Sequence, residues 1–248
     1  MAAGFRCKQF YVDHAQCAMK VSTDALMLGA WVQLPTQGYV LDIGTGTGIL
    51  SLMLAQRSKA ISIDAIELDS DACAAARANV QQSPWPTQIN IIERDILTYP
   101  GSADHQNARR YPCLISNPPY FTASLPSPNA KRQQARHNDV LPFQDLFAVA
   151  QQLAAPAALF HLVLPIQEFI RCQSIWPQFG WHLVRRCDVK ATPQHDVSRV
   201  LFSLQYADGE SCLATLAEPA AELLVIRDNQ QIYTLDYQRL LADFYLRF

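Results

Sequence analysis

The chain has 248 residues, 50% of them hydrophobic and 17% charged, which is enough to bury a large core and excludes a disordered or repeat-built protein. Its formal charge of −2 gives no overall basic footprint for nucleic acid. No apolar run approaches the roughly 18 residues of a membrane span, and Arg6 and Lys8 stand where a signal peptide would be apolar. The seven cysteines lie far apart without a CxxC pair, so we expect a cytoplasmic protein with reduced thiols and no metal.

Apolar runs alternate with helical patterns along the chain, which predicts βαβ units and one doubly wound α/β domain. The expected strands are 39–43, 60–67, 89–93, 113–116 and 158–164, and the expected helices are 49–57, 70–82, 143–154 and 167–179. Two later strands, 181–190 and 200–206, are separated by a short loop, which favours an antiparallel hairpin at the sheet edge. The segment 121–141 has no apolar periodicity, and a loop of that length is usually functional or disordered.

A glycine-rich turn connects the first strong strand to the first helix after it. Its sequence is Asp42-Ile43-Gly44-Thr45-Gly46-Thr47-Gly48. Glycines at such a turn let a ligand approach main-chain N–H groups at a helix N-terminus. The spacing is DxGxGxG, which matches neither the dinucleotide fingerprint GxGxxG nor the P-loop. With no pyrophosphate to bind, the turn favours a carboxylate such as that of the methionine part of S-adenosylmethionine.

Two further acids stand where the same ligand would need them. Glu67 ends the second strand, near the offset at which an acid binds ribose hydroxyls. Asp95 follows the third strand and is placed to accept a hydrogen bond from an adenine amino group. A single acid at a strand end is usually a helix cap. Three acids on consecutive strands, at the edge where open α/β sheets bind ligands, indicate a binding site instead.

The fourth strand ends in Asn117-Pro118-Pro119-Tyr120. Each proline fixes its own φ and restricts the preceding residue, so the Asn117 side-chain oxygen and the Pro118 carbonyl can be held rigidly. Together they can accept both hydrogens of a planar NH₂ group and localise its lone pair for attack on a sulfonium methyl group. This is catalysis by positioning and electrostatics. Tyr120 can stack on the flat group that carries the amine.

The glycine turn and the Asn-Pro-Pro-Tyr motif together resemble class I S-adenosylmethionine-dependent methyltransferases, which have a Rossmann-like sheet. Over nearly the whole chain, the sequence further resembles the bacterial tRNA (adenine-N6)-methyltransferases that modify nucleotide 37 of a valine tRNA. The more specific segments are Cys17-Ala18-Met19-Lys20-Val21, Leu28-Gly29-Ala30-Trp31, Gln81-Gln82-Ser83-Pro84-Trp85-Pro86, Gln134-Ala135-Arg136, Gly180-Trp181-His182-Leu183 and Phe244-Tyr245-Leu246.

This resemblance implies roles for the residues named above. S-adenosylmethionine would be bound by the turn, by the strand-end acids and by the amide of the catalytic motif, that is, by Asp42, Gly44, Thr45, Gly46, Gly48, Glu67, Asp95 and Asn117. The target adenine would be held by the catalytic residues Asn117, Pro118 and Tyr120, with Pro119 between them. A tRNA partner needs phosphate contacts, for which the candidates are Lys131, Arg132 and Arg136. Neither an obligate protein partner nor a membrane is expected.

The chain would then be one methyltransferase domain, 1–248, made of an N-terminal lid segment (1–38), a cofactor-binding and catalytic core (39–165) and a C-terminal edge hairpin and tail (166–248). Three alternatives remain. A protein-glutamine N5-methyltransferase uses the same motif but usually has a helical domain ahead of the turn, where this chain has 41 residues. A guanine-N2 rRNA methyltransferase usually has phenylalanine in place of Tyr120. A non-catalytic RNA-binding relative would have no reason to retain Asp42, Glu67, Asp95 and Asn117.

Overall fold

The computed structural model describes residues 4–13, 20–102, 109–119, 141–207 and 219–247. Eight strands form one sheet with the order β10-β8-β9-β7-β6-β3-β4-β5. The strands of this sheet are β3 (Gly38–Ile43), β4 (Ile61–Glu67), β5 (Ile89–Glu93), β6 (Tyr111–Ser116), β7 (Ala154–Pro165), β8 (Trp181–Lys190), β9 (Val197–Tyr206) and β10 (Glu222–Val225). All neighbouring pairs are parallel except the two that include β9. The doubly wound α/β fold expected from the sequence is therefore confirmed.

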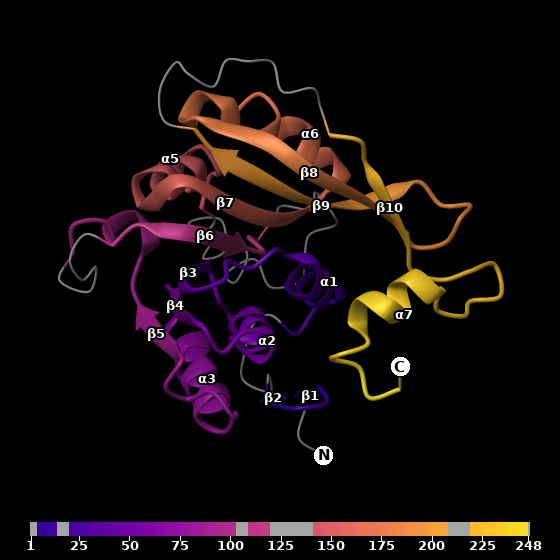
Figure 1. Ribbon diagram of the computed structural model, residues 1–248, viewed down its shortest axis with the longest axis horizontal. Coiled ribbons are helices and arrows are strands. Elements are labelled where there is room, and N and C mark those ends of the chain that lie inside the picture. The colour runs from indigo at the N-terminus through magenta and orange to yellow at the C-terminus, as the bar shows by residue number, and fades with distance from the viewer. Residues whose placement is uncertain (1–3, 14–19, 103–108, 120–140, 208–218, 248) are drawn as a thin grey trace, which may run out of the picture.

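Helices cover both faces of the sheet (Figure 1). One face carries α1 (Thr23–Trp31), α2 (Ile49–Arg57), α3 (Ser70–Gln81) and α7 (Leu235–Leu241). The other carries α5 (Phe143–Leu153), α6 (Ile166–Cys172) and the 3₁₀ helix η3 (Trp176–Phe179). Each face has its own core, because the central strands are apolar on both sides, as buried parallel strands require.

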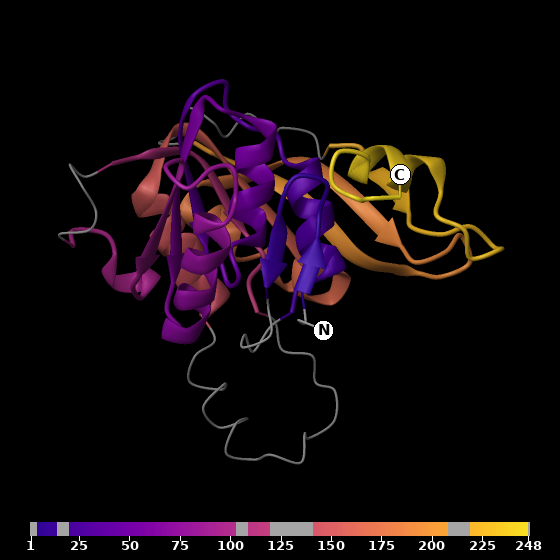
Figure 2. The same ribbon diagram turned by 90° about the horizontal axis from the view of Figure 1, so that it is seen from below.

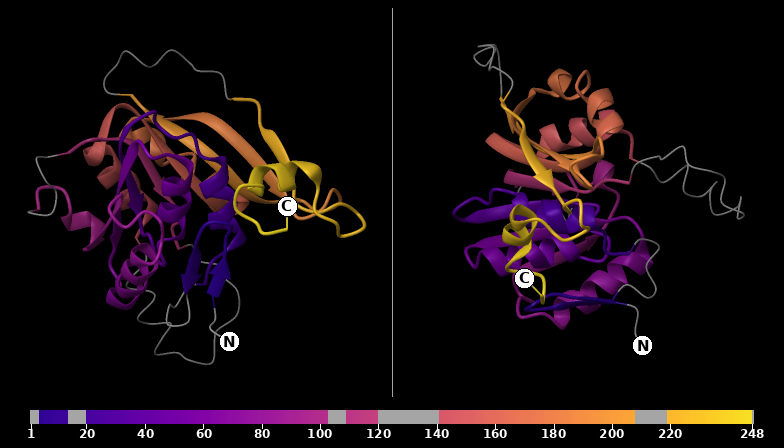
Figure 3. Two further views of the ribbon diagram at one scale, coloured as in Figure 1. Left: turned by 60° about the horizontal axis from the view of Figure 1, so that its bottom comes forward. Right: turned by 90° about the vertical axis from the view of Figure 1, so that its right-hand side faces the viewer.

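The small antiparallel hairpin of β1 (Gly4–Arg6) and β2 (Tyr11–Asp13) packs outside the helical layer formed by α1, α2, α3 and α7 (Figure 3, right). The end of the chain lies beside it, since the Lys8 N–H donates to the Phe244 carbonyl at 2.9 Å. Phe244 is buried in the same core as Phe10. An aromatic tail as apolar as Phe244-Tyr245-Leu246-Arg247-Phe248 is expected to pack on the sheet edge. Its described part packs instead with this hairpin, where the Phe5 and Tyr245 rings lie 5.9 Å apart between centroids, while Phe248 lies outside the described residues.

Three features of the C-terminal half differ from the expectation. The hairpin of β8 and β9 is present, but β9 lies between β7 and β8, and β10 pairs in parallel outside β8. The helix predicted at 167–179 is wrong in part, since α6 ends at Cys172 and η3 follows after a turn. Pro177 has no N–H with which to continue the hydrogen bonds of α6, so one α-helix cannot run through it.

The strand order places the candidate site. The chain runs from β3 outward to β4 and β5, then returns to β6 on the other side of β3. Parallel strands that leave in opposite directions from one point create a crevice at their carboxyl ends, where ligands bind in this class of sheet. Here the crevice lies between the ends of β3 and β6, and Ser116 Oγ joins the two strands by donating to the Ile43 carbonyl at 2.8 Å.

Candidate active site

The glycine turn follows β3 directly and enters α2. Gly44, Gly46 and Gly48 have φ angles of 72°, 55° and 81°, a region that residues with a side chain rarely adopt. The Gly44 N–H donates to the Ile66 carbonyl at 2.9 Å, which ties the turn to β4. A Cβ atom at Gly44 or Gly46 would meet no protein atom within 4 Å, so it would project into open space. The turn therefore leaves room for a ligand against its backbone.

Asp42 lies beneath this turn and is completely buried. Its Oδ2 accepts hydrogen bonds from Thr45 Oγ1 and Ser51 Oγ, both at 2.7 Å, whereas its Oδ1 has no partner among the described residues. Burial raises the pKa of Asp42 to about 6, and the two hydroxyl bonds offset part of that rise. Asp42 lines neither of the two cavities that adjoin the turn. It fixes the turn from below, through Thr45.

Glu67 ends β4 and faces the turn. Its Oε2 accepts a hydrogen bond from the Gly46 N–H at 2.9 Å, and its Oε1 accepts from the N–H groups of Leu68 and Asp69 at 2.8 and 3.0 Å. All three donors are backbone groups of loops at the carboxyl edge. The carboxylate is therefore held in one orientation at the mouth of the crevice.

Asp95 occupies the equivalent position after β5. Its Oδ1 accepts a hydrogen bond from the Leu97 N–H at 2.9 Å, which caps the 3₁₀ helix η1 (Ile96–Thr98). The structure thus gives Asp95 the capping role that is usual for a single acid. It also lines a cavity of about 260 Å³, together with Glu67, Gly44 and Pro118.

Asn117 and Pro118 stand where two cavities adjoin. Asn117 lines a small cavity of about 40 Å³ beside Gly44 and Thr45, and Pro118 and Pro119 line the larger one. Gly44 lines both, so the cavities meet at the glycine turn. The structure therefore brings together the ends of β3, β4, β5 and β6, as the sequence indicated.

Some lining residues were not expected. Lys20, Ser22 and Ala25, at the start of α1, line the small cavity. The signal for this helix start was Ser22, whose Oγ accepts a hydrogen bond from the Ala25 N–H at 3.2 Å. Leu68 and Leu97 line the larger cavity with exposed fractions of 53% and 46%. Such apolar side chains at a cavity mouth suit a flat aromatic ligand.

Four of the predicted site residues, Tyr120, Lys131, Arg132 and Arg136, lie outside the described residues, as does nearly all of the segment 121–141. The described structure therefore does not test their roles. A second basic run, around 185–190, is occupied by ion pairs: Arg185 binds Glu222 at 2.7 Å, and Arg186 binds Asp188 at 2.7 Å.

Within the described residues, no group of three or more His, Cys, Asp or Glu side chains is arranged to hold a metal ion. Within the same ranges, no helix has the length and apolar character needed to span a membrane.

Comparison with solved structures identifies the class of this fold. The chain is similar to a protein described as a predicted O-methyltransferase from Agrobacterium tumefaciens, with a TM-score of 0.68 and 14% identity over 89% of this chain and 96% of the other. It is also similar to a glycopeptide N-methyltransferase, with a TM-score of 0.52 and 12% identity over 75% of this chain and 95% of the other. The fold is that of a class I methyltransferase.

The sequence is similar to one family within this class. Residues 17–136 match the family model described as "Methyltransferase small domain". The chain is 40% identical to the tRNA1(Val) (adenine(37)-N6)-methyltransferase of Pseudoalteromonas translucida, over 99% of both chains. It is 39% identical to the protein of the same name in Photobacterium profundum, over 100% of both. The chain belongs to this family, so the resemblance found in the sequence is confirmed.

Proposed function

We propose that this protein transfers the methyl group of S-adenosylmethionine to N6 of an adenine in tRNA, most specifically nucleotide 37 of valine tRNA, in the cytoplasm. The observation that carries the proposal is the position of Asn117 and Pro118, at the end of β6 and at the junction of two cavities beside the glycine turn. The names of the full-length relatives support the substrate.

The residues of the crevice fit S-adenosylmethionine in shape and charge. The open backbone of Gly44 and Gly46 would take the methionine part, supported from below by Asp42 and Thr45. Gly48 has a structural role at the junction of the turn and α2. A Cβ atom at this position would lie 3.5 Å from the Ala76 side chain, and α2 begins directly after it. Its φ of 81° completes the turn.

The adenosine part would lie in the larger cavity. Glu67 would accept hydrogen bonds from the ribose hydroxyls, and Asp95 from the adenine amino group, with the exposed side chains of Leu68 and Leu97 against the ring. Because Glu67 already binds three backbone N–H groups, its carboxylate needs little reorganisation to receive a ligand.

The bound cofactor supplies an electrophilic methyl group on a sulfonium. The protein's task is to present the target nitrogen to it. The Asn117 side-chain oxygen and the Pro118 carbonyl would accept the two N6 hydrogens, which localises the nitrogen lone pair toward the methyl group. The new N–C bond forms as the S–C bond breaks and its electron pair remains on sulfur. N6 then releases one proton.

RNA binding would use residues after the catalytic motif. Tyr120 would stack on the target adenine once it leaves the anticodon loop, where little pairing energy opposes flipping. Lys131, Arg132 and Arg136 would contact the phosphates on either side. We further propose that the chain acts as one domain, with residues 1–38 as a lid over the cofactor.

The decisive experiment is a methyl-transfer assay with labelled S-adenosylmethionine and three substrates in parallel: unmodified valine tRNA, a release factor and ribosomal RNA. Label should enter tRNA and digest to N6-methyladenosine. The Asn117→Ala variant should lose at least about 100-fold in rate, as expected when one preorganised polar contact to the reacting group is removed.

Gln88→Ala is the matched control, because it removes an amide side chain at the opposite edge of the sheet, just before β5. It should retain wild-type activity. Label that appears only in protein or ribosomal RNA would overturn the proposed substrate. Full activity of Asn117→Ala would overturn the proposed mechanism.

A further inference from the structure

A third cavity, of about 310 Å³, lies beyond the site described above. It is an open cavity lined by the start of α1, the loop between β8 and β9, and the segment that links β10 to α7. The side chains that matter here are Thr23, Thr192, His195, Arg227, Gln231 and Tyr233. The function proposed above assigns no role to any of them.

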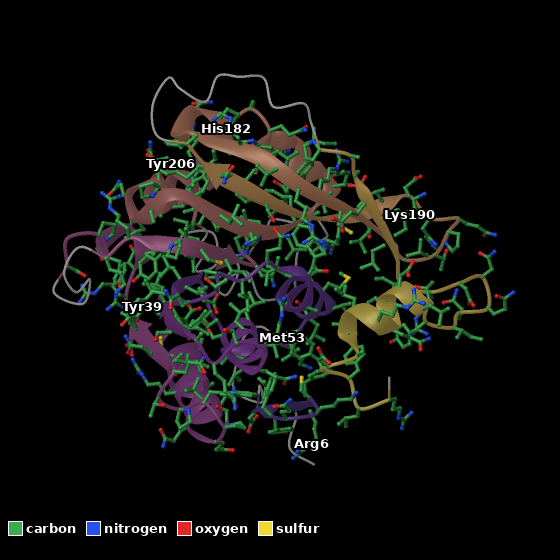
Figure 4. The ribbon with its side chains drawn as sticks, viewed as in Figure 1. Arg6, Tyr39, Met53, His182, Lys190 and Tyr206 are labelled. Atoms are coloured by element: carbon green, nitrogen blue, oxygen red, sulfur yellow. The ribbon has the colours of Figure 1, made fainter. Side chains whose placement is uncertain are left out.

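This third cavity opens at the same sheet edge as the cofactor crevice. β8 is antiparallel to β9, which is antiparallel to β7, so Lys190 at the end of β8 lies at the carboxyl edge with Ser116 at the end of β6. Figure 4 shows Lys190 near α7, far from His182 at the beginning of β8. Three strand spacings separate β6 from β8, which is about 14 Å.

Two adjacent residues at the start of α1 connect the small cavity of the active site with the third cavity. Ser22 lines the small cavity near Asn117, and the adjacent Thr23 lines the third cavity. An RNA strand with its target base at Asn117 would therefore pass the third cavity within a few nucleotides. Figure 2 shows α7 and the segment before it beside the end of β8 and the start of β9.

Arg227 is held in a fixed position in this cavity. Its guanidinium carbon lies 3.9 Å from the centre of the Tyr233 ring, and its Nη1 donates to the Gln231 carbonyl at 2.6 Å. The Tyr233 ring is stacked on Tyr237 with 5.1 Å between centroids and 15° between planes. A guanidinium held in this way loses little side-chain entropy when it binds an anion.

The other polar side chains of the lining can form hydrogen bonds and carry no negative charge, and Ala191 and Ile226 are apolar. His195 is exposed, and its Nδ1 lies 2.6 Å from Thr192 Oγ1, which orients the ring. No Asp or Glu belongs to the described residues that line the cavity. Three acids are adjacent in sequence to lining residues: Asp24 binds Arg199 at 2.8 Å, Asp228 accepts from the N–H groups of Gln230 and Ile232, and Asp196 follows the exposed His195.

From these observations we infer that the third cavity is a second RNA contact, which binds a backbone phosphate of the substrate near the target adenine through Arg227 and His195. The inference rests on the proposed function, because it takes the ligand to be the same RNA. Phosphate contacts fix the register of a nucleic acid without reading its sequence, so this cavity would orient the strand for the base held at Asn117.

The test measures binding of unmodified valine tRNA to the full chain at several salt concentrations. Arg227→Glu should raise the Kd by about tenfold or more, and the slope of log K against log salt should fall by about 1. The Kd for S-adenosylmethionine should stay at the wild-type value. His195→Ala, in an exposed position, should raise the tRNA Kd by a few fold.

Arg110→Glu is the matched control, because this exposed arginine precedes β6 at the opposite edge and donates to the Gln152 carbonyl. It should leave tRNA affinity unchanged. Wild-type tRNA affinity in both Arg227→Glu and His195→Ala would overturn the inference, and so would an equal loss of tRNA affinity in Arg110→Glu. In either case, methylation of tRNA by the wild-type protein would leave the proposed function intact. A wild-type protein that neither binds nor methylates tRNA would overturn both.

Discussion

The Asp42→Asn substitution is expected to stabilise the protein at neutral pH while it weakens cofactor binding. Burial raises the pKa of Asp42 from 3.8 to about 6. Between these values the unfolded chain releases the proton and the folded chain keeps it, so the free energy of unfolding falls as pH rises. Well above pH 6, the raised pKa lowers the free energy of unfolding by about 3 kcal/mol in total. About 2 kcal/mol of this decrease occurs between pH 4.5 and pH 8. Asparagine cannot ionise and carries no such cost.

Urea unfolding at several pH values measures this difference. The free energy of unfolding of Asp42→Asn minus that of the wild type should increase by about 2 kcal/mol from pH 4.5 to pH 8. Ser51→Ala, which removes one hydroxyl bond that lowers the pKa of Asp42 but keeps its carboxyl group, should retain the direction of the wild-type pH dependence and steepen it. Calorimetry should show weaker binding of S-adenosylmethionine by Asp42→Asn. A difference that is constant with pH would refute the reasoning.

Two further predictions concern buried groups away from the site. Tyr111→Phe should cost about 1–3 kcal/mol in urea unfolding, because the buried Tyr111 hydroxyl donates to Asp64 at 2.8 Å and lies 2.8 Å from the Tyr99 hydroxyl; an unchanged stability would contradict this. Burial lowers the pKa of His161, next to Ser203, to about 3, so the unfolded state takes up a proton first and the free energy of unfolding of the wild type minus that of His161→Gln should fall by about 2 kcal/mol from pH 7 to pH 5. A difference that does not change with pH would assign the acid sensitivity to other groups.

The glycine turn and the Asn117 motif could be predicted because local chemistry constrains them. Three alternating glycines between an apolar strand and a helix, and prolines that follow an asparagine, each restrict the backbone without help from distant residues. The structure places both at the junction of two cavities, as expected.

Other elements depend on contacts with residues far along the chain and could not be predicted from the local sequence. α1 is buried at every residue from Ala25 to Gly29, since it packs against α2, α7 and the sheet, so its sequence shows no periodic polar face. Arg185 and Arg186 form a basic run in the sequence, but the partner of Arg185, Glu222, lies 37 residues further along the chain, so this ion pair could not be predicted from the local sequence. β10 has only four residues, too few for a recognisable pattern.

The contact between the first hairpin and the last helix affects how the protein is made. Lys8 and Ala242 are hydrogen-bonded although they stand 234 residues apart. A ribosome releases Phe10 and Val12 early, yet Phe244, which shares their core, follows the strands of the central sheet in the chain. The hairpin therefore completes its packing only after Phe244 has been synthesised. Until then the nascent chain exposes an apolar surface that chaperones can recognise.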